Sequence, residues 1–349
     1  MPGPVEAGLG RRVHAALGEL SPGYFAAAMA TGILSIGFAA DGFPVLSTVM
    51  LDLAIVAFLG LLLLTVWRFV AHRGELVADF THPHRGFGFY SFVAAADVLA
   101  VRLAPQHSHL AALLLAVAAV SWLARGYAVP WTTRLGSGEH PIVAAANGSW
   151  FMWEVGGQSI AVAAAVLAPE YGGSFLPLVA VLAWALGLFL YIVDGVFVVM
   201  RLLAFRFTAA DLTPPYWVAM GAAAISVLAG AHIVALAAGP FVSPVRELVR
   251  GTELLLWAVA TWLLPGLFAM GWWRHVTHRV PLVYEANLWS IVFPLGMYAV
   301  CTHQLAHVER LPWLGGLGAA WIWVALAAWA LTGMGMVRHV VQDVLLGAG

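Results

Sequence analysis

Three carboxylates, Asp97, Glu154 and Asp194, lie inside long apolar stretches of the sequence. Ionisable side chains are costly in such segments and usually indicate function when the segment crosses a membrane. We expect Asp97 and Glu154 to take part in moving a substrate or a proton. The alternative is a buried carboxylate that is hydrogen-bonded to a neighbour and only supports the fold. Asp194 lies near the end of its stretch, and we expect it to be structural.

The residues after Glu154 are unusual for a membrane helix. Gly156 and Gly157 follow it directly, and the polar pair Gln158 and Ser159 comes next. Two adjacent glycines weaken a helix because glycine loses the most conformational freedom on ordering. The polar pair could then serve freed backbone groups or a substrate.

Three histidines, His232, His303 and His307, fall toward the ends of two later apolar stretches. Histidine titrates near neutral pH, so these side chains could relay protons or attract anions. His303 and His307 are one helical turn apart, a spacing also found in metal or haem ligation. The plainer alternative is that they face lipid headgroups or pack on aromatic rings, and no nearby carboxylate completes a metal motif.

The stretch Asn287–Ala306 combines membrane-spanning length with a helix-breaking residue. Pro294, preceded by Phe293, removes one backbone hydrogen bond and clashes with the preceding turn, so a kink is expected. A membrane tolerates such a break only beside other helices or a water-filled cavity. Polar residues also follow, including Thr302 and His303. This stretch is therefore predicted to be an inner helix that lines a passage.

The composition indicates an integral membrane protein. The chain has 349 residues, of which 62% are hydrophobic and 9% are charged, against about 25% charged in soluble domains. Apolar segments leave no room for a sizeable soluble domain. Cys301 is the only cysteine, which excludes an intrachain disulfide and a cysteine metal cluster. The net charge of −1 gives no indication of nucleic-acid binding, and we expect neither a nucleic-acid partner nor a cofactor.

The predicted architecture is an all-α polytopic membrane protein whose ten transmembrane helices form five helical hairpins around a central pore. Residues 1–20 are expected to be a cytoplasmic N-terminal segment with a short amphipathic helix, 21–340 the transport domain, and 341–349 a cytoplasmic tail. The ten predicted spans are 22–40, 46–67, 86–104, 107–124, 142–168, 174–200, 215–238, 252–273, 288–306 and 312–337.

Arginine placement predicts the orientation of these spans. All 16 basic residues are Arg, and 12 of them fall in one set of loops against 4 in the other. Cytoplasmic loops carry the basic excess, so both termini should face the cytoplasm. The four arginines on the opposite side are Arg102, Arg246, Arg250 and Arg310.

The first and seventh spans resemble each other. Each opens with Pro and two aromatic residues, and each places Met six residues before Ser, at Met29 and Ser35 and at Met220 and Ser226. Internal repeats in transporters place the substrate site at the repeat interface. The alternative is chance, because Ala, Gly and Met are common in membrane helices.

Four motifs together resemble those of the tellurite-resistance and C4-dicarboxylate transporter family, which includes slow-type anion channels and malate and sulfite transporters. They occur in order between about 20 and 340. The motifs are MATGILSI at Met29–Ile36, NGSWFMWEVGGQ at Asn147–Gln158, PPYWVAMGAAAIS at Pro214–Ser226 and WSIVFPLGMY at Trp289–Tyr298.

The resemblance implies odd-numbered helices inside, even-numbered helices outside, and a homotrimer with one pore per subunit. It also implies a phenylalanine that occludes the pore, at the position of Phe293 beside Pro294. The expected partners are the lipid bilayer and small anions: C4-dicarboxylates such as malate, sulfite, tellurite-related oxyanions, or chloride and nitrate. The expected location is a bacterial inner membrane. The residues expected to line the substrate path are Phe25, Met29, Thr31, Ser35, Asp97, Glu154, Gln158, Met220, His232 and His303.

Anion transport competes with two other classes. One is a polytopic membrane enzyme or haem-bearing redox protein that uses His232, His303 and His307; the other is a scaffold or sensor. No arginine lies deep in a predicted inner helix, so selectivity would come from helix dipoles, backbone N–H groups and weak polar side chains. That favours a channel or a low-affinity carrier, and Asp97 and Glu154 favour proton coupling. The prediction is a transport protein rather than an enzyme.

Overall fold

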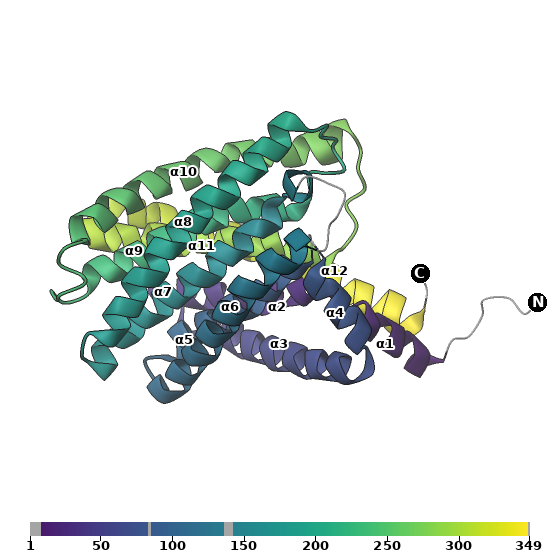
Figure 1. Ribbon diagram of the computed structural model, residues 1–349, viewed down its shortest axis with the longest axis horizontal. Coiled ribbons are helices and arrows are strands. Elements are labelled where there is room, and N and C mark those ends of the chain that lie inside the picture. The colour runs from purple at the N-terminus through teal and green to yellow at the C-terminus, as the bar shows by residue number, and fades with distance from the viewer. Residues whose placement is uncertain (1–7, 83–84, 136–141, 348–349) are drawn as a thin grey trace, which may run out of the picture.

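The computed structural model describes residues 8–82, 85–135 and 142–347, and ten helices of this part are long and apolar enough to cross a membrane. They pair as five antiparallel hairpins arranged in two layers (Figure 1). The inner layer comprises α2 (Phe25–Ala40), α5 (Tyr90–Leu103), α7 (Phe151–Tyr171), α9 (Val218–Ala235) and α11 (Trp289–Glu309). The outer layer comprises α3 (Pro44–Ala71), α6 (Ser108–Leu135), α8 (Phe175–Ala204), α10 (Arg246–Trp272) and α12 (Pro312–His339).

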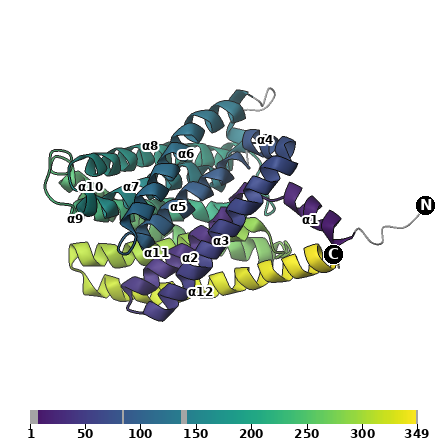
Figure 2. The ribbon, with the colours of Figure 1, turned by 90° about the horizontal axis from the view of Figure 1, so that it is seen from below.

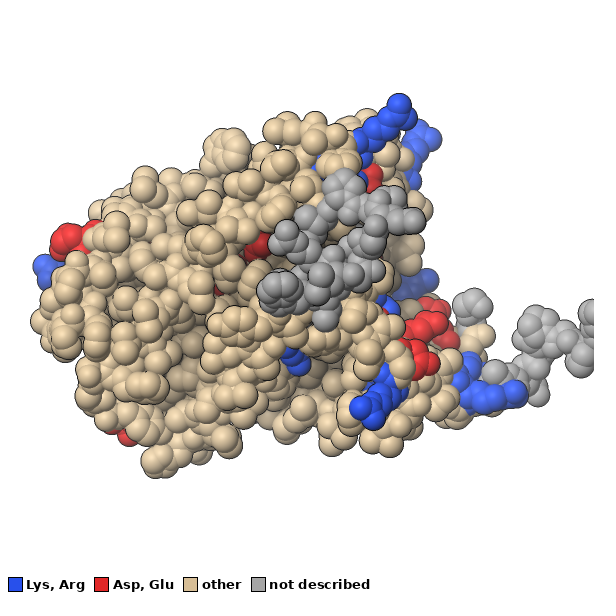
Figure 3. All heavy atoms as spheres, in the orientation of Figure 1, with Lys and Arg blue, Asp and Glu red and all other residues tan. Residues whose placement is uncertain are grey.

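Burial separates the two layers clearly. In the most apolar part of each span, 72–89% of the inner residues are buried, against 17–22% of the outer ones. The all-α fold of ten spans predicted from the sequence is therefore confirmed. Charged residues gather mainly at the two ends of the molecule, and few lie on the surface between them, as expected of a surface that faces lipid (Figure 3).

The five inner helices form a closed ring in the order α2, α5, α7, α9, α11, with each packed against the next. Small residues allow this close approach, as in other membrane helix interfaces. A Cβ added at Gly32 would lie 2.6 Å from Val98 Cγ1, and one at Gly296 would lie 2.8 Å from Ile33 Cγ2. At Gly221 it would lie 2.8 Å from Pro294 Cγ.

Every inner helix begins with a 3₁₀ turn, and these five turns also contact one another in a ring. The 3₁₀ turn that opens the first and seventh spans is thus a local structure that all five hairpins share. The ring of turns requires glycine at position 148, because a Cβ there would lie 2.2 Å from the Pro215 carbonyl oxygen. The five turns are Pro22–Tyr24, Gly86–Phe89, Gly148–Trp150, Pro214–Trp217 and Ala286–Leu288.

Two predicted span starts were wrong by six residues, and the fourth span's helix continues past the predicted end at 124 to Leu135. The fifth span begins at Gly148 instead of 142, because Ile142–Ala145 forms a separate turn and the Asn147 side chain accepts a hydrogen bond from Ser149 N at 2.8 Å, which starts a new helix. The eighth span begins at Arg246 instead of 252. Arg246 can open this helix because its guanidinium donates to the Val234 and Leu236 carbonyls.

Two short helices lie outside the bundle layers. α1 (Leu9–Gly18) occupies the position of the predicted amphipathic helix, and α4 (Arg73–Thr81) follows α3. α1 lies beside the C-terminal end of α12 and the π-helical turn Val340–Leu346 (Figures 1 and 2). Arg12 fixes this contact by donating to the Leu345 carbonyl at 2.7 Å.

Candidate functional site

A small cavity lies where all five inner helices meet, and we call it the axial cavity. Its volume is about 20 Å³, which is room for roughly one water molecule. The ring of inner helices therefore leaves little open space at this level. Four of the helices contribute to the lining with one or two residues each, and α5 contributes three. The lining consists of Ile33, Ile36, Asp97, Val98, Val101, Ser159, Val162, Ile225, Leu228 and Met297.

Asp97 and Ser159 are the polar members of this lining. Ser159 Oγ donates a hydrogen bond to Asp97 Oδ2 at 2.7 Å and also contacts the Gly156 carbonyl at 2.8 Å. Asp97 Oδ1 has no hydrogen-bond partner among the described residues, although the carboxylate is buried. Asp97 and Ser159 are thus hydrogen-bonded to each other in the wall of a mainly apolar cavity, and one carboxylate oxygen is left without a donor.

Glu154 lies in the first turn of α7 and joins α7 to α9. Ser226 Oγ donates to Glu154 Oε1 at 2.8 Å, while Oε2 has no hydrogen-bond partner in the described part of the chain. Gln158, one turn further along α7, points toward the outer layer, since its Nε2 donates to the Trp184 carbonyl at 3.2 Å. Glu154 and Gln158 are thus close in sequence but form hydrogen bonds with different helices, α9 and α8.

Thr31 and Ser35 of α2 both bond to the outer layer. The Trp329 indole N–H donates to Thr31 Oγ1 at 2.8 Å. Ser35 Oγ donates to the Ser47 carbonyl at 2.7 Å and accepts from Arg102 Nε at 3.0 Å. Neither side chain is among those that line the axial cavity.

Phe25 packs edge-on against Phe58 and Phe92 and lines a separate cavity near the start of α2. Met29 and Met220 are fully buried in the ring. Neither methionine, nor Phe25, lines the axial cavity. Their role in a substrate path stays a prediction.

Phe293 and Pro294 lie near the start of α11, which continues through the proline. Both are buried, and Phe293 is one helical turn before Met297 on the same face of α11. Met297 lines the axial cavity, whereas Phe293, one turn nearer the 3₁₀ turn, is not among the lining residues. Its function as a gate stays a prediction.

The histidines do not converge on one site. His303 Nδ1 lies 3.0 Å from Asp41 Oδ1, which is an ion-pair distance, although the orientation is not that of a hydrogen bond. Burial raises the pKa of the Asp41 carboxyl, and the neighbouring His303 partly offsets that rise. In the described part of the chain, no three His, Cys, Asp or Glu side chains are grouped to hold a metal ion.

Sequence reasoning missed two groups of residues. The apolar residues that line the axial cavity were overlooked. Ile33 and Ile36 of α2 are three residues apart, as are Ile225 and Leu228 of α9, and this spacing could have indicated that each pair lies on one face of its helix. Glu253 of the outer helix α10 was also overlooked. It is fully buried against Gly230 of α9, and neither of its carboxylate oxygens has a hydrogen-bond partner among the described residues.

Comparison with known proteins identifies the class. Residues 19–337 match the model of the voltage-dependent anion channel family. The chain is 50% identical over 157 residues to the uncharacterized membrane protein Rv1735c of Mycobacterium tuberculosis, which covers 45% of this chain and 80% of that protein. It is 22% identical over 319 residues to the uncharacterized transporter MJ0762 of Methanocaldococcus jannaschii, covering 88% and 91% of the two chains.

The chain belongs to the voltage-dependent anion channel family, which confirms the resemblance found in the sequence. It is therefore a multi-pass membrane protein of an anion channel and transporter family rather than an enzyme. The redox or haem enzyme weighed as an alternative is set aside by this membership.

Proposed function

We propose that small anions cross the membrane along the axis of the inner ring, at low affinity, through a passage that is closed in this conformation. One observation carries the proposal: five helix N-termini meet at one mouth, above an axial cavity lined by all five helices. Each N-terminus presents unpaired N–H groups and the positive end of a helix dipole, which favours anions.

The lining supports passage rather than tight binding. No basic side chain lines the axial cavity, whose described lining is apolar apart from Asp97 and Ser159. An anion that has left water would find few donors there, so a long-lived bound state is disfavoured. The candidate substrates are those implied by the family: C4-dicarboxylates such as malate, sulfite, tellurite-related oxyanions, chloride and nitrate.

The proposed gate is Phe293. It lies one turn from Met297 along α11, and Met297 lines the axial cavity. Bulky apolar side chains at a constriction block ions by excluding water. Opening would require Phe293 and the apolar lining to move aside.

A proton-coupled carrier is the second candidate, and the buried carboxylates Asp97 and Glu154 favour it. Each has one oxygen without a hydrogen-bond donor among the described residues. A pure anion pore gains nothing from such groups, whereas a proton carrier needs them.

The proposed setting is a bacterial inner membrane with both termini in the cytoplasm and a homotrimeric assembly. The arginine excess supports the orientation, because the mouth formed by the 3₁₀ turns lies on the same side as most arginines. The exposed apolar side chains of the outer helices fit either lipid or neighbouring subunits.

A flux assay in proteoliposomes tests the proposal. Purified protein would be reconstituted, and uptake of chloride, nitrate, sulfite and malate would be measured with and without a pH gradient. Uptake above that of protein-free liposomes is expected for at least one anion, and acceleration by a pH gradient would favour the carrier. Absence of uptake for the whole panel would contradict the proposed passage.

A further inference from the structure

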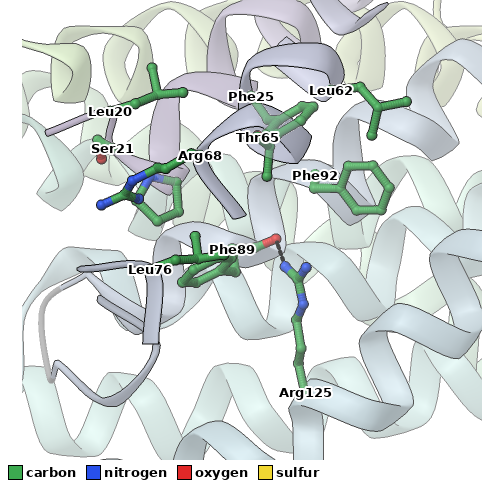
Figure 4. A pocket seen from close by; sticks show the side chains of 11 residues that line it. Leu20, Ser21, Phe25, Leu62, Thr65, Arg68, Leu76, Phe89, Phe92 and Arg125 are labelled. Atoms are coloured by element: carbon green, nitrogen blue, oxygen red, sulfur yellow. Dashed lines mark hydrogen bonds between the residues drawn. The ribbon is translucent and has the colours of Figure 1, made fainter. Parts of the chain in front are cut away.

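A second cavity lies away from the axis, and we call it the lateral cavity. Its volume is about 140 Å³, and it shares no lining residue with the axial cavity. It is enclosed by the start of α2, the later part of α3, the turn before α5, and α6 (Figure 4). Its lining includes Phe25, Leu62, Thr65, Arg68, Phe92 and Arg125.

Arg68 brings positive charge to one wall of the lateral cavity. Its guanidinium is buried, donates to the Gly18 carbonyl at 2.8 Å and pairs with Asp79 at 2.8 Å. Asp79 also pairs with Arg85 at 2.6 Å. One carboxylate therefore serves two guanidinium groups, and Glu75 adds a second negative charge near Arg68.

Arg125 forms the opposite wall and has no carboxylate partner among the described residues. Its guanidinium donates to the Phe89 carbonyl, as Figure 4 shows, and lies over the rings of Phe89 and Phe92 at 4.9 and 5.8 Å from their centroids. A guanidinium has five N–H donors. Within the described part of the chain Arg125 donates to the Phe89 carbonyl, and most of its other N–H donors have no protein acceptor there.

We propose that the lateral cavity binds a phosphate-type oxyanion, held between Arg125 and Arg68. The planar guanidinium matches the oxygens of a phosphate group and binds them as a fork. The cavity is large enough for one such group. A lipid headgroup and free inorganic phosphate carry the same chemistry, and the surrounding Phe25, Leu62 and Phe92 would suit the carbon atoms of a lipid.

Two binding measurements on the full-length protein in detergent test this site. Native mass spectrometry would count bound phosphatidylglycerol against phosphatidylcholine, and calorimetry would titrate inorganic phosphate. Arg125→Gln removes the charge, and Thr65→Phe fills the cavity while keeping both arginines. The matched control is Arg73→Gln, which removes an exposed arginine nearby that does not line the cavity.

We expect Arg125→Gln and Thr65→Phe each to weaken binding about tenfold or more, equivalent to about 1.4 kcal/mol, and Arg73→Gln to leave it within about twofold. Preference for phosphatidylglycerol without phosphate binding identifies a lipid headgroup site, whereas phosphate binding without lipid preference identifies a free-anion site. If Arg125→Gln does not fold, Arg125→Lys keeps the charge but loses the fork, and weaker binding is expected. Unchanged binding in the folded Arg125 and Thr65 variants, or equal loss in Arg73→Gln, would overturn the proposal.

Discussion

Ser159 Oγ donates a 2.7 Å hydrogen bond to Asp97 Oδ2, and this contact joins α7 to α5 at the wall of the axial cavity. It satisfies one carboxylate oxygen and leaves Oδ1 without a partner in the described part of the chain. In its ionised form, Asp97 places a negative charge there that opposes an approaching anion, because Coulomb repulsion is weakly screened inside a protein.

At a pH at which Asp97 is ionised, Asp97→Asn should therefore raise anion uptake, by about tenfold if the variant removes about 1.4 kcal/mol of repulsion. The amide keeps the shape and can still accept the hydrogen bond from Ser159. Uptake in proteoliposomes, compared at equal protein content, measures the effect. Asp194→Asn is the matched control, since Asp194 is a buried carboxylate on the outer helix α8. An equal rise in both variants would mean that the position of Asp97 on the axis is irrelevant.

Glu154→Gln should flatten the pH dependence of uptake if Glu154 carries a proton during transport. The substitution removes the protonation site but keeps an oxygen to accept from Ser226 Oγ. The measurement is initial uptake between about pH 5 and pH 8, the range in which a carrier group would titrate. Glu253→Gln serves as the control, because Glu253 is equally buried but lies on the outer helix α10. A pH profile identical to that of the original protein would make Glu154 a structural residue.

The architecture followed from the sequence because its determinants are local. Segment length, charge and arginine bias specify ten spans and their pairing, and short turns make antiparallel neighbours. The site depends on how each helix is rotated about its own axis, because this rotation decides which residues face the centre of the ring. The sequence indicates that rotation only weakly. Thr31, Ser35 and Gln158 were expected to line the substrate path, and in the structure each makes a hydrogen bond with an outer helix. In a membrane, a polar side chain is as useful for joining helices as for lining a passage.

Asp97 was singled out because a carboxylate is costly in mid-membrane and usually indicates function there; its role stays a prediction. The apolar lining residues had no such signal. Ile33, Val98 and Ile225 differ from neighbouring residues only in the face they present. The pairing of Asp41 with His303 is also a property of the fold, since it joins residues at the ends of α2 and α11.

Asp41 gives a stability prediction with a definite sign. Its pKa is higher in the folded protein than in the unfolded chain, mainly because of burial. Such a carboxyl stabilises the fold below its unfolded pKa of about 4, and this contribution is lost as pH rises through the folded pKa. Asp41→Asn should therefore remove a decline in melting temperature that begins just above about pH 4. Melting curves in detergent from about pH 3.5 to pH 8 measure this; parallel curves for both proteins would contradict it.

Orientation can be tested at Glu170, near the end of α7 opposite the 3₁₀ turns. If both termini are cytoplasmic, a cysteine at this position faces outward and reacts with an impermeant maleimide added to intact cells. The background is low because the single native thiol, Cys301, is buried. Thr208 is exposed in the loop after α8, so Thr208→Cys provides the control on the opposite side. Labelling of position 208 alone would reverse the proposed orientation.

Phe293 allows two accounts that differ in the sign of their effect on transport. If its ring seals the passage, Phe293→Ala widens the constriction and should raise conductance severalfold or more in planar bilayers. If the ring only packs against a neighbouring helix, the same change leaves a cavity, costs about 3–5 kcal/mol, and lowers stability and flux together.

Phe38 provides the matched control for this test. It is also fully buried, but it lies further along α2 and packs edge-on against Phe43 and Trp323, with ring centroids 6.1 and 5.4 Å away. Phe38→Ala should thus lower the melting temperature without raising conductance. The gate requires that Phe293→Ala conduct more than both the original protein and Phe38→Ala. A Phe293→Ala channel that conducts less and melts earlier, as Phe38→Ala is expected to do, would assign Phe293 to packing and leave the apolar lining around Met297 as the barrier.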